Sequence, residues 1–317
     1  DVLESFRQIV DGRGCVIRYG YMAYRWGDVS QRGDVASAAK PVYTHFLLKA
    51  LEDGRIVSLD ETVANVEPRL NEINKELGHK DRRIAWRHLA NQTACYGVRE
   101  EPGTAFDYND WQMALFWDCL FQKVYGARGE TIDEHLLKPM LAEVLQCEDQ
   151  PTMAVFGASD RLGRMGLSVR DFARFGLLYL REGQWGDKQL VSREHARMVV
   201  SGPLPATLPR TTGLQAEMIA GARTVGSNRI PDDQSDHFGS YSWLWWVNGI
   251  DRNGVRMWPD APADMYCASG HSGQRVLAVI PSLDLVVSYN TGTIKEWTNG
   301  AEAPFNQAMK CLVAAIK

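Results

Sequence analysis

The first 60 residues change from a helical to a strand-like pattern of hydrophobic positions and then back again. Residues 2–10 place their apolar side chains on one face of a helix. Residues 15–26 are aromatic and β-branched and are interrupted by Gly20, which predicts two strands. Apolar side chains at helical spacing return over residues 41–54, and the proline that opens this stretch is tolerated in a first helical turn.

The middle of the chain, residues 55–165, is helical in pattern. It contains no strand-like alternation of any length, and its clearest helical stretches begin at Trp86 and at Trp111. This block therefore predicts a helical unit that contributes nothing to a sheet.

The chain after residue 165 combines helices, strands and one long loop. A helix is predicted at 167–180, with Ser168 as its N-cap in an S-x-x-D capping box. Residues 201–240 hold four prolines and several glycines and predict a long loop, a feature that is often functional. A closing helix is predicted at 303–316. Strands are predicted at 241–247, 275–280 and 283–289.

This order of elements predicts an α+β chain with one antiparallel sheet flanked by helices. Two isolated strands are barely stable, so the early strand pair must join the late strands in the same sheet. We expect an α/β domain built from residues 1–60 and 166–317, with an all-helical domain inserted at 61–165.

Composition narrows the classes of protein. The 317 residues are 45% hydrophobic and 23% charged, which is typical of a folded chain of about two domains. A net charge of −4 without a basic stripe argues against nucleic acid as a partner. No apolar run reaches the ~18 residues of a membrane span. The chain begins at Asp1 without the charged and apolar regions of a signal peptide.

The cysteines and histidines give little support to a metal site. The six cysteines form no C-x-x-C, and the seven histidines form no H-E-x-x-H. We interpret the cysteines as core thiols, although an even count also permits disulfides.

The first candidate for chemistry is the run Ser37-Ala-Ala-Lys40. Residues three apart share one helical face, so the lysine amine can reach the serine hydroxyl. A serine becomes a nucleophile when a base takes its proton, and a lysine can act as that base when its surroundings favour the neutral form. The alternative is an ordinary surface pair at a helix start.

Two further runs carry candidate residues. Pro102 to Asp110 is a turn that leads to Tyr108, and a tyrosine beside an ammonium can serve as a base. The alternative is a helix cap by Asn109 or Asp110. Ser269 to Gln274 lies directly before a strand, and small residues that open an edge strand suit close approach of a ligand to the backbone. The alternative is a simple glycine-rich turn.

Taken in order, these three runs resemble the motifs of the serine β-lactamase and penicillin-binding-protein superfamily. The class C-like branch, which includes carboxylesterases, D-aminopeptidases and nylon-oligomer hydrolases, looks most similar. The resemblance covers nearly the whole chain, because three longer segments also look like those of the family: 51–60, 84–97 and 166–176.

The resemblance implies a role for each matching residue. Ser37 would be the acylated nucleophile, Lys40 its proton partner and Tyr108 the second base. The backbone N–H groups of Ser37 and Gln274 would form the oxyanion hole. The family needs no metal or other cofactor for this chemistry.

The substrate-binding positions depart from the family pattern. The family's asparagine two residues after the tyrosine is Asp110, and a carboxylate accepts hydrogen bonds but donates none. We expect Asp110 to keep Lys40 protonated and so to shift the base role toward Tyr108. The lysine that opens the third motif in β-lactamases is His271, followed by Gly273. Since histidine is mostly neutral at pH 7, this change favours less anionic substrates.

The sequence therefore predicts a serine hydrolase that acts through an acyl-enzyme on small esters or amides, and a carboxylesterase-like enzyme is favoured. The alternatives are a penicillin-binding or sensor-like protein that turns over poorly, a weak β-lactamase or D-aminopeptidase, and an inactive scaffold. The site should lie between the two domains, roofed partly by the 201–240 loop. Related proteins are often exported, which favours a periplasmic or secreted location, and the oligomeric state is left open.

Overall fold

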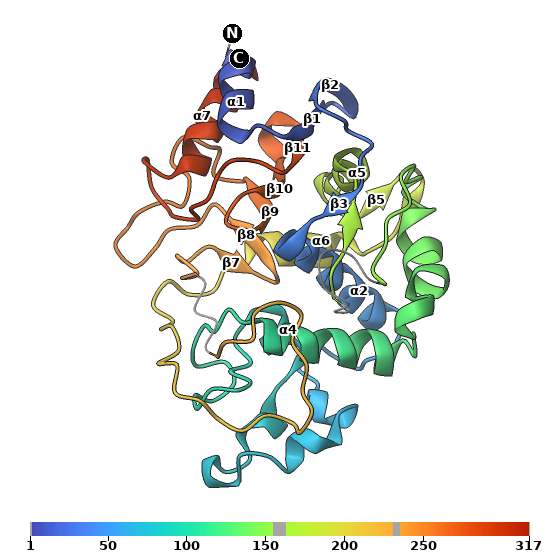
Figure 1. Cartoon of the computed structure of the whole chain (residues 1–317), viewed down its shortest axis with the longest axis vertical. Helices are drawn as coiled ribbons and strands as arrows, with labels where there is room; N and C mark the ends of the chain where they lie inside the picture. The colour runs from blue at the N-terminus through green and yellow to red at the C-terminus, as the bar shows by residue number, and fades with distance from the viewer. Residues whose placement is uncertain (1, 155–162, 231–234, 317) are drawn as a thin grey trace.

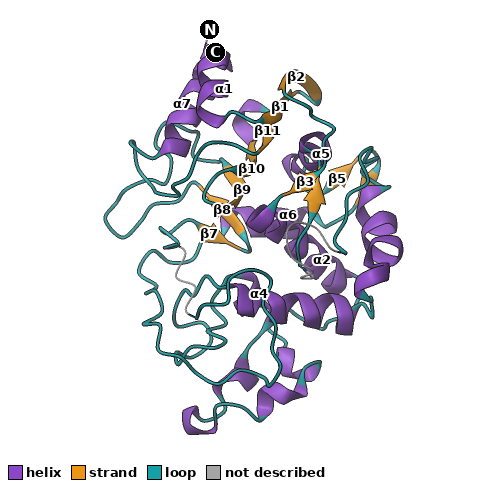
Figure 2. Ribbon diagram, in the orientation of Figure 1, coloured by secondary structure: helices purple, strands orange, loops and turns teal. Residues whose placement is uncertain are grey.

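A seven-stranded antiparallel sheet forms the centre of the molecule in the computed structural model, which describes residues 2–154, 163–230 and 235–316 (Figure 1, Figure 2). The strand order is β2-β1-β11-β10-β9-β8-β7. The strands are β1 (Arg13–Arg18), β2 (Tyr21–Trp26), β7 (Tyr241–Ser242), β8 (Trp245–Val247), β9 (Tyr266–Gly270), β10 (Arg275–Ile280) and β11 (Leu285–Asn290).

The early strand pair joins the late strands through β1 and β11. Cys15 lies opposite Ser288, and each neighbouring pair continues the antiparallel register. The predicted α+β fold, with one antiparallel sheet assembled from both ends of the chain, is thereby confirmed.

Helices cover both faces of this sheet. The Cys15 thiol contacts the carbonyl of Val169, at the start of α5 (Val169–Leu180), on one face. Trp26 lies opposite Gly14 in the register, and its ring meets Phe6 of α1 (Val2–Val10) edge to face, with centroids 5.7 Å apart. Because successive residues of a strand point to opposite faces, α1 and α5 lie on opposite sides of the sheet. Helix α7 (Pro304–Ile316) packs beside α1.

The segment between α2 (Lys40–Glu52) and the second half of the chain is built from short helices and loops (Figure 2). It contributes no strand to the seven-stranded sheet within its described residues. The division into domains at residues 60 and 165 stays a prediction. The helices of this segment are α3 (Trp86–Ala90), α4 (Asp110–Trp117), the 3-10 turns Val63–Asn65, Pro68–Asn71, Lys75–Leu77, Lys80–Arg83 and Gly129–Thr131, and the π-helices Asp118–Val124 and Asp133–Ala142.

Smaller elements complete the fold. Beyond α5 the chain forms a short hairpin and then α6, before the long loop begins. A separate two-stranded sheet pairs a segment before α2 with one just before α5. These elements are β3 (Gly33–Asp34), β4 (Gly166–Leu167), β5 (Gln184–Trp185), β6 (Lys188–Gln189), α6 (Arg193–Ser201) and the 3-10 turn Pro281–Leu283.

One predicted strand is wrong in detail. Residues 241–247 form a hairpin, β7 and β8, instead of one continuous strand. Trp243 and Leu244 form its turn with φ values of 50° and 71°. A two-residue hairpin turn of the I′ type needs positive φ at both positions, which Asn-Gly signals and Trp-Leu does not.

The predicted long loop contains no helix or strand in its described part, and we call residues 202–230 the strap; residues 231–234 lie outside the described residues. The strap runs along the helical segment and is bonded to it repeatedly. Phe106 N–H donates to the Pro209 carbonyl at 2.8 Å, and Ala216 N–H donates to the Gly97 carbonyl at 2.9 Å.

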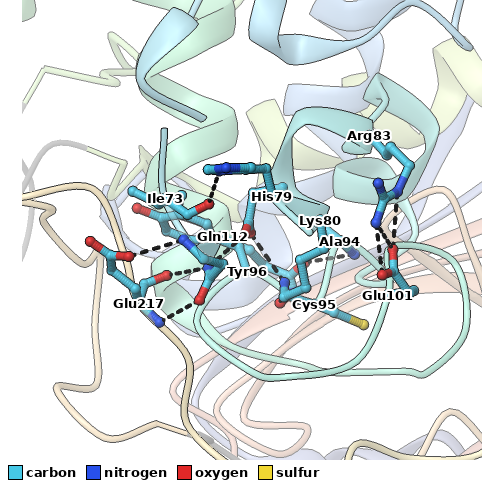
Figure 3. Close-up of polar contacts among 12 residues, drawn as sticks. Ile73, His79, Lys80, Arg83, Ala94, Cys95, Tyr96, Glu101, Gln112 and Glu217 are labelled. Carbon is cyan, nitrogen blue, oxygen red and sulfur yellow. Dashed lines mark hydrogen bonds and ion pairs between the residues drawn. The ribbon is translucent and has the colours of Figure 1, made fainter. Parts of the chain in front are cut away.

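Glu217 fixes the strap to the tip of the helical segment (Figure 3). Its carboxylate accepts from Asn74 N–H at 2.9 Å, and its own N–H donates to the Asn74 side chain at 2.9 Å. Beside this joint, the buried Lys80 ammonium donates to the Cys95 carbonyl at 2.8 Å and pairs with Asp81 at 3.1 Å. These bonds therefore fix the strap to the helical segment.

The cysteines are present as free thiols. All six cysteines lie in the described part of the chain and are free, and four of them are buried. Burial raises the pKa of the Cys95 thiol to about 12, so that thiol is unreactive near neutral pH.

Among the described helices, none is long and apolar enough to cross a membrane.

Buried His45 makes the stability of the fold dependent on pH. It lies in α2 among the rings of Phe46, Phe175 and Tyr179, and burial lowers its pKa to about 3. An unfolded chain protonates this histidine below pH 6.5, so the unfolded state binds more protons and stability falls as the pH falls from 6.5 toward 3. We expect His45→Leu to flatten this decline by up to about 1.4 kcal/mol per pH unit. Urea unfolding at pH 7, 6 and 5 measures it, and parallel losses in variant and wild type would contradict the expectation.

Candidate active site

Ser37 and Lys40 lie at the junction between a 3-10 turn, η1 (Ala36–Ala39), and α2. The turn begins with a left-handed residue, Ala36, at φ 49°. Its N–H is held by the Asp34 carboxylate at 2.8 Å, and the preceding Val35 N–H donates to the carbonyl of Met165 at 3.1 Å. These two bonds fix the backbone that presents the serine.

The Lys40 ammonium connects two of the predicted site residues. It donates to Ser37 Oγ at 2.8 Å and to the Tyr108 hydroxyl at 2.9 Å. Lys40 is 5% exposed and Tyr108 is 7% exposed, whereas Ser37 is partly exposed, so the buried pair meets the serine at the edge of the solvent. Hydrogen bonds between such groups are stronger than they are in water, and a proton can pass along them over short distances.

Tyr108 is positioned by a buried polar network. Asn109 caps α4, and its side-chain oxygen accepts from Gln112 N–H at 2.8 Å. The Gln92 carbonyl accepts from Asp107 N–H at 2.9 Å, and the Gln92 side chain accepts from Asn109 N–H at 3.3 Å. The helix cap and the candidate base are thus both present. The sequence analysis missed both glutamines: Gln112 is a polar residue inside the largely apolar helix α4, whereas Gln92 lies in a polar turn after α3 and carries no local signal.

The third motif forms the turn between β9 and β10. His271, Ser272 and Gly273 have φ values of 47°, 57° and 97°, a strained run for the two residues that are not glycine. Of the two predicted oxyanion donors, the N–H of Gln274 makes a long bond of 3.3 Å to the His271 carbonyl within this turn. The N–H of Ser37 donates to no backbone oxygen in the described part of the chain.

Gly270 brings β9 directly against the nucleophile turn. A methyl group on Gly270 would overlap the Val35 carbonyl oxygen and lie 3.1 Å from Ala38 N. At Gly270 the close approach is made by the backbone of η1, and the approach of a ligand to this motif stays a prediction. The expectation that this motif opens an edge strand is wrong, because β10 lies between β9 and β11.

Asp110 does not lie where the sequence analysis expected. Its carboxylate is 9% exposed and accepts from Ser227 N–H in the strap at 2.8 Å. Among the described residues, no ion pair joins Asp110 to Lys40. The direct contact expected to keep Lys40 protonated is absent.

Two arginines, Arg164 and Arg275, contribute positive charge to the surroundings of His271. Burial and the charges of Arg275 and Arg164 lower the pKa of His271, while Asp34 and Asp110 act in the opposite direction. Arg164 forms an ion pair with Asp34. The Nε and Nη1 atoms of Arg275 are buried and have no hydrogen-bond partner among the described residues. The lowered pKa favours the neutral form of His271, while Arg164 and Arg275 contribute positive charge to its surroundings.

Comparison with known proteins places the fold. No protein-family model matches the chain, and no curated protein matches it. A β-lactamase from Mycobacterium bovis shares 17% identity with a TM-score of 0.62, over 100% of this chain and 99% of that one. A penicillin-binding-protein homologue from Caulobacter crescentus shares 13% identity with a TM-score of 0.63, over 99% and 96%. A variant of simvastatin synthase from Aspergillus terreus shares 13% identity with a TM-score of 0.64, over 99% and 98%.

These similarities confirm, at the level of the fold, the resemblance drawn from the sequence. The chain has the fold of the serine β-lactamase and penicillin-binding-protein superfamily along its whole length. Sequence identity this low shows the fold alone, so the chemistry must be argued from the residues of this chain.

Gly270 tests whether β9 positions the nucleophile. We expect Gly270→Ala to move η1 and to slow labelling of Ser37 by a fluorophosphonate probe by about tenfold or more, because overpacking of this size costs about 1–3 kcal/mol. Gly176→Ala is the matched control, since its added methyl would overlap Val286 on the far part of the sheet. Labelling rates and melting temperatures are measured for both. Wild-type labelling of Gly270→Ala would contradict the expectation.

Proposed function

From a chain with this fold, we propose a serine hydrolase that acts through an acyl-enzyme on small esters or amides. One observation carries the proposal: the Lys40 ammonium lies within hydrogen-bond distance of both Ser37 Oγ and the Tyr108 hydroxyl, in a buried position. A serine, a proton acceptor and a second proton-carrying group in contact are the parts that acyl transfer needs.

In the acylation step, Ser37 Oγ attacks the carbonyl carbon of the substrate, and its proton passes by way of the Lys40 ammonium to the Tyr108 oxygen, which must be ionised to receive it. The oxyanion that forms faces the free N–H of Ser37 and that of Gln274, whose long bond to His271 is weak enough to exchange. The C–O or C–N bond then breaks, and the leaving group takes a proton from Tyr108.

In the deacylation step, a water molecule gives a proton to Tyr108 and attacks the acyl carbon. The bond to Ser37 Oγ breaks, the acid leaves, and the serine regains its proton through Lys40. The buried polar network of Gln92, Asn109 and Gln112 keeps the tyrosine in place through both steps.

A second candidate function is a penicillin-binding protein or weak β-lactamase. The positive charges of Arg164 and Arg275 beside His271 favour it, because β-lactams carry a carboxylate. The expectation of less anionic substrates rested on both Asp110 and His271, and these two arginines weaken the part that rests on His271. Intact mass after incubation with a β-lactam separates the candidates: a lasting adduct supports the penicillin-binding protein, and turnover of nitrocefin supports the β-lactamase.

Ser37→Ala tests the nucleophile. We expect hydrolysis of a short acyl p-nitrophenyl ester to fall by at least about a thousandfold, because removal of a nucleophile leaves only the contribution of binding. Ser58→Ala, on the loop that follows α2, is the control and should keep full activity. Ester hydrolysis and fluorophosphonate labelling are measured in parallel. Undiminished hydrolysis by Ser37→Ala would remove the assignment, and a wild type that neither labels nor turns over would indicate an inactive scaffold.

Arg275→Gln tests the charge beside His271. We expect kcat/KM for an ester with a carboxylate in its acyl group to fall about tenfold, because one charge-assisted hydrogen bond is lost, with little change for the neutral ester of the same length. Arg181→Gln, whose side chain pairs with Asp284 at the surface, is the matched control. An equal effect of Arg275→Gln on both esters would show that this arginine does not bind the substrate.

A further inference from the structure

A turn of the strap closes around the Asp110 carboxylate. Asp110 Oδ2 accepts from Ser227 N–H at 2.8 Å, and the Asp110 carbonyl accepts from Val225 N–H at 3.4 Å. The Thr224 hydroxyl donates to the Ser227 carbonyl at 2.7 Å and accepts from Gly226 N–H at 3.3 Å. The four residues 224–227 thus form a turn whose inner side is filled by the carboxylate.

The contact with Asp110 leaves no space for a side chain at Gly226. A methyl group on Gly226 would overlap Asp110 Oδ2. Its backbone is not in the left-handed region, so the need for glycine here is one of space and not of conformation.

An ion pair fixes the residue just before the turn. The Arg223 guanidinium donates to both oxygens of Asp118, at 2.9 and 3.0 Å, and stacks over the ring of Trp117. Asp110 begins α4, and Asp118 follows its last residue. The turn is therefore tied at both ends of the helix that follows Tyr108.

The same turn reaches the other side of the site. Val225 packs against Gly163, where a methyl group would overlap the valine side chain. The Gly163 carbonyl accepts from the hydroxyl of Tyr43, which lies on α2 one turn beyond Lys40. Residues 224–227 therefore bridge the helix after Tyr108 and the helix that carries Lys40.

We propose that Asp110 is a positioning residue that latches the strap turn 224–227 across the site, and that the latched turn limits the size of the acyl group. An acceptor side chain suits this task, because the turn offers it the backbone N–H of Ser227. The position two residues after Tyr108 thus serves to hold the strap turn. The limit on acyl size rests on the proposed hydrolase function; the latch itself does not.

Gly226→Ala tests the proposal without touching a residue of the chemistry. Gly202→Ala is its matched control, since Gly202 also lies in the strap, has ordinary φ and has room for a methyl group. Two measurements are made on the full chain: hydrogen exchange of the 223–228 amides, and kcat/KM for acetyl, butyryl and octanoyl p-nitrophenyl esters. We expect Gly226→Ala to speed exchange about tenfold, because the latch bond is lost, and to raise the octanoyl-to-acetyl ratio by a similar factor.

Asp110 variants separate the latch from a general loss of stability. Asp110→Ala should reproduce both effects of Gly226→Ala, whereas Asp110→Asn keeps an acceptor oxygen and should stay within about threefold of wild type in exchange. Unchanged exchange in Gly226→Ala and Asp110→Ala overturns the latch. Faster exchange with an unchanged acyl profile overturns the role in size selection. If the wild type hydrolyses none of the esters, the hydrolase proposal fails while the exchange data still decide the latch.

Discussion

The structure of the site depends on one buried ammonium group. Lys40 is almost fully enclosed, and a buried charge is tolerated only where hydrogen bonds replace its water. Its partners come from two separate parts of the chain, Ser37 from the turn before its own helix and Tyr108 from the helical segment 68 residues later. The need to satisfy this one group therefore holds the two parts together at the point where the proposed chemistry occurs.

The surrounding elements serve to hold those partners in place. Gly270 has no side chain, so β9 can touch the turn η1 that carries Ser37. This contact helps to fix the position of Ser37. Gln92 and Asn109 fix the backbone on both sides of Tyr108 through a buried network. Such a network is rigid only when its polar groups are paired, and this explains why polar residues remain in a largely apolar segment.

Two departures from the superfamily pattern acquire a physical meaning in three dimensions. Asp110 turns away from Lys40 toward the strap, so its charge is met by the backbone N–H of Ser227. The lowered pKa of His271 favours its neutral form, yet Arg164 and Arg275 place positive charge next to it. In both cases the change in charge at one position is balanced by other groups: the Ser227 N–H for Asp110, and Arg164 and the nearby Arg275 for His271.

The sequence alone was enough for many features that depend on neighbouring residues, although it did not predict β9 or α6. Hydrophobic periodicity placed most helices and strands, the Ser168 cap was read correctly, and Ser37 with Lys40 follows from helical spacing. Local rules failed at Trp243 and Leu244, whose turn carries no local signal and is held by Asn91 and Thr44.

Only the tertiary structure decided the partner of Asp110, the two arginines beside His271 and the course of the strap. Except for Arg275, which lies four residues after His271, these contacts join segments tens to hundreds of residues apart. Their free energy comes from charges and backbone groups that find each other only after the sheet and the helical segment have packed, so no local pattern in the sequence encodes them.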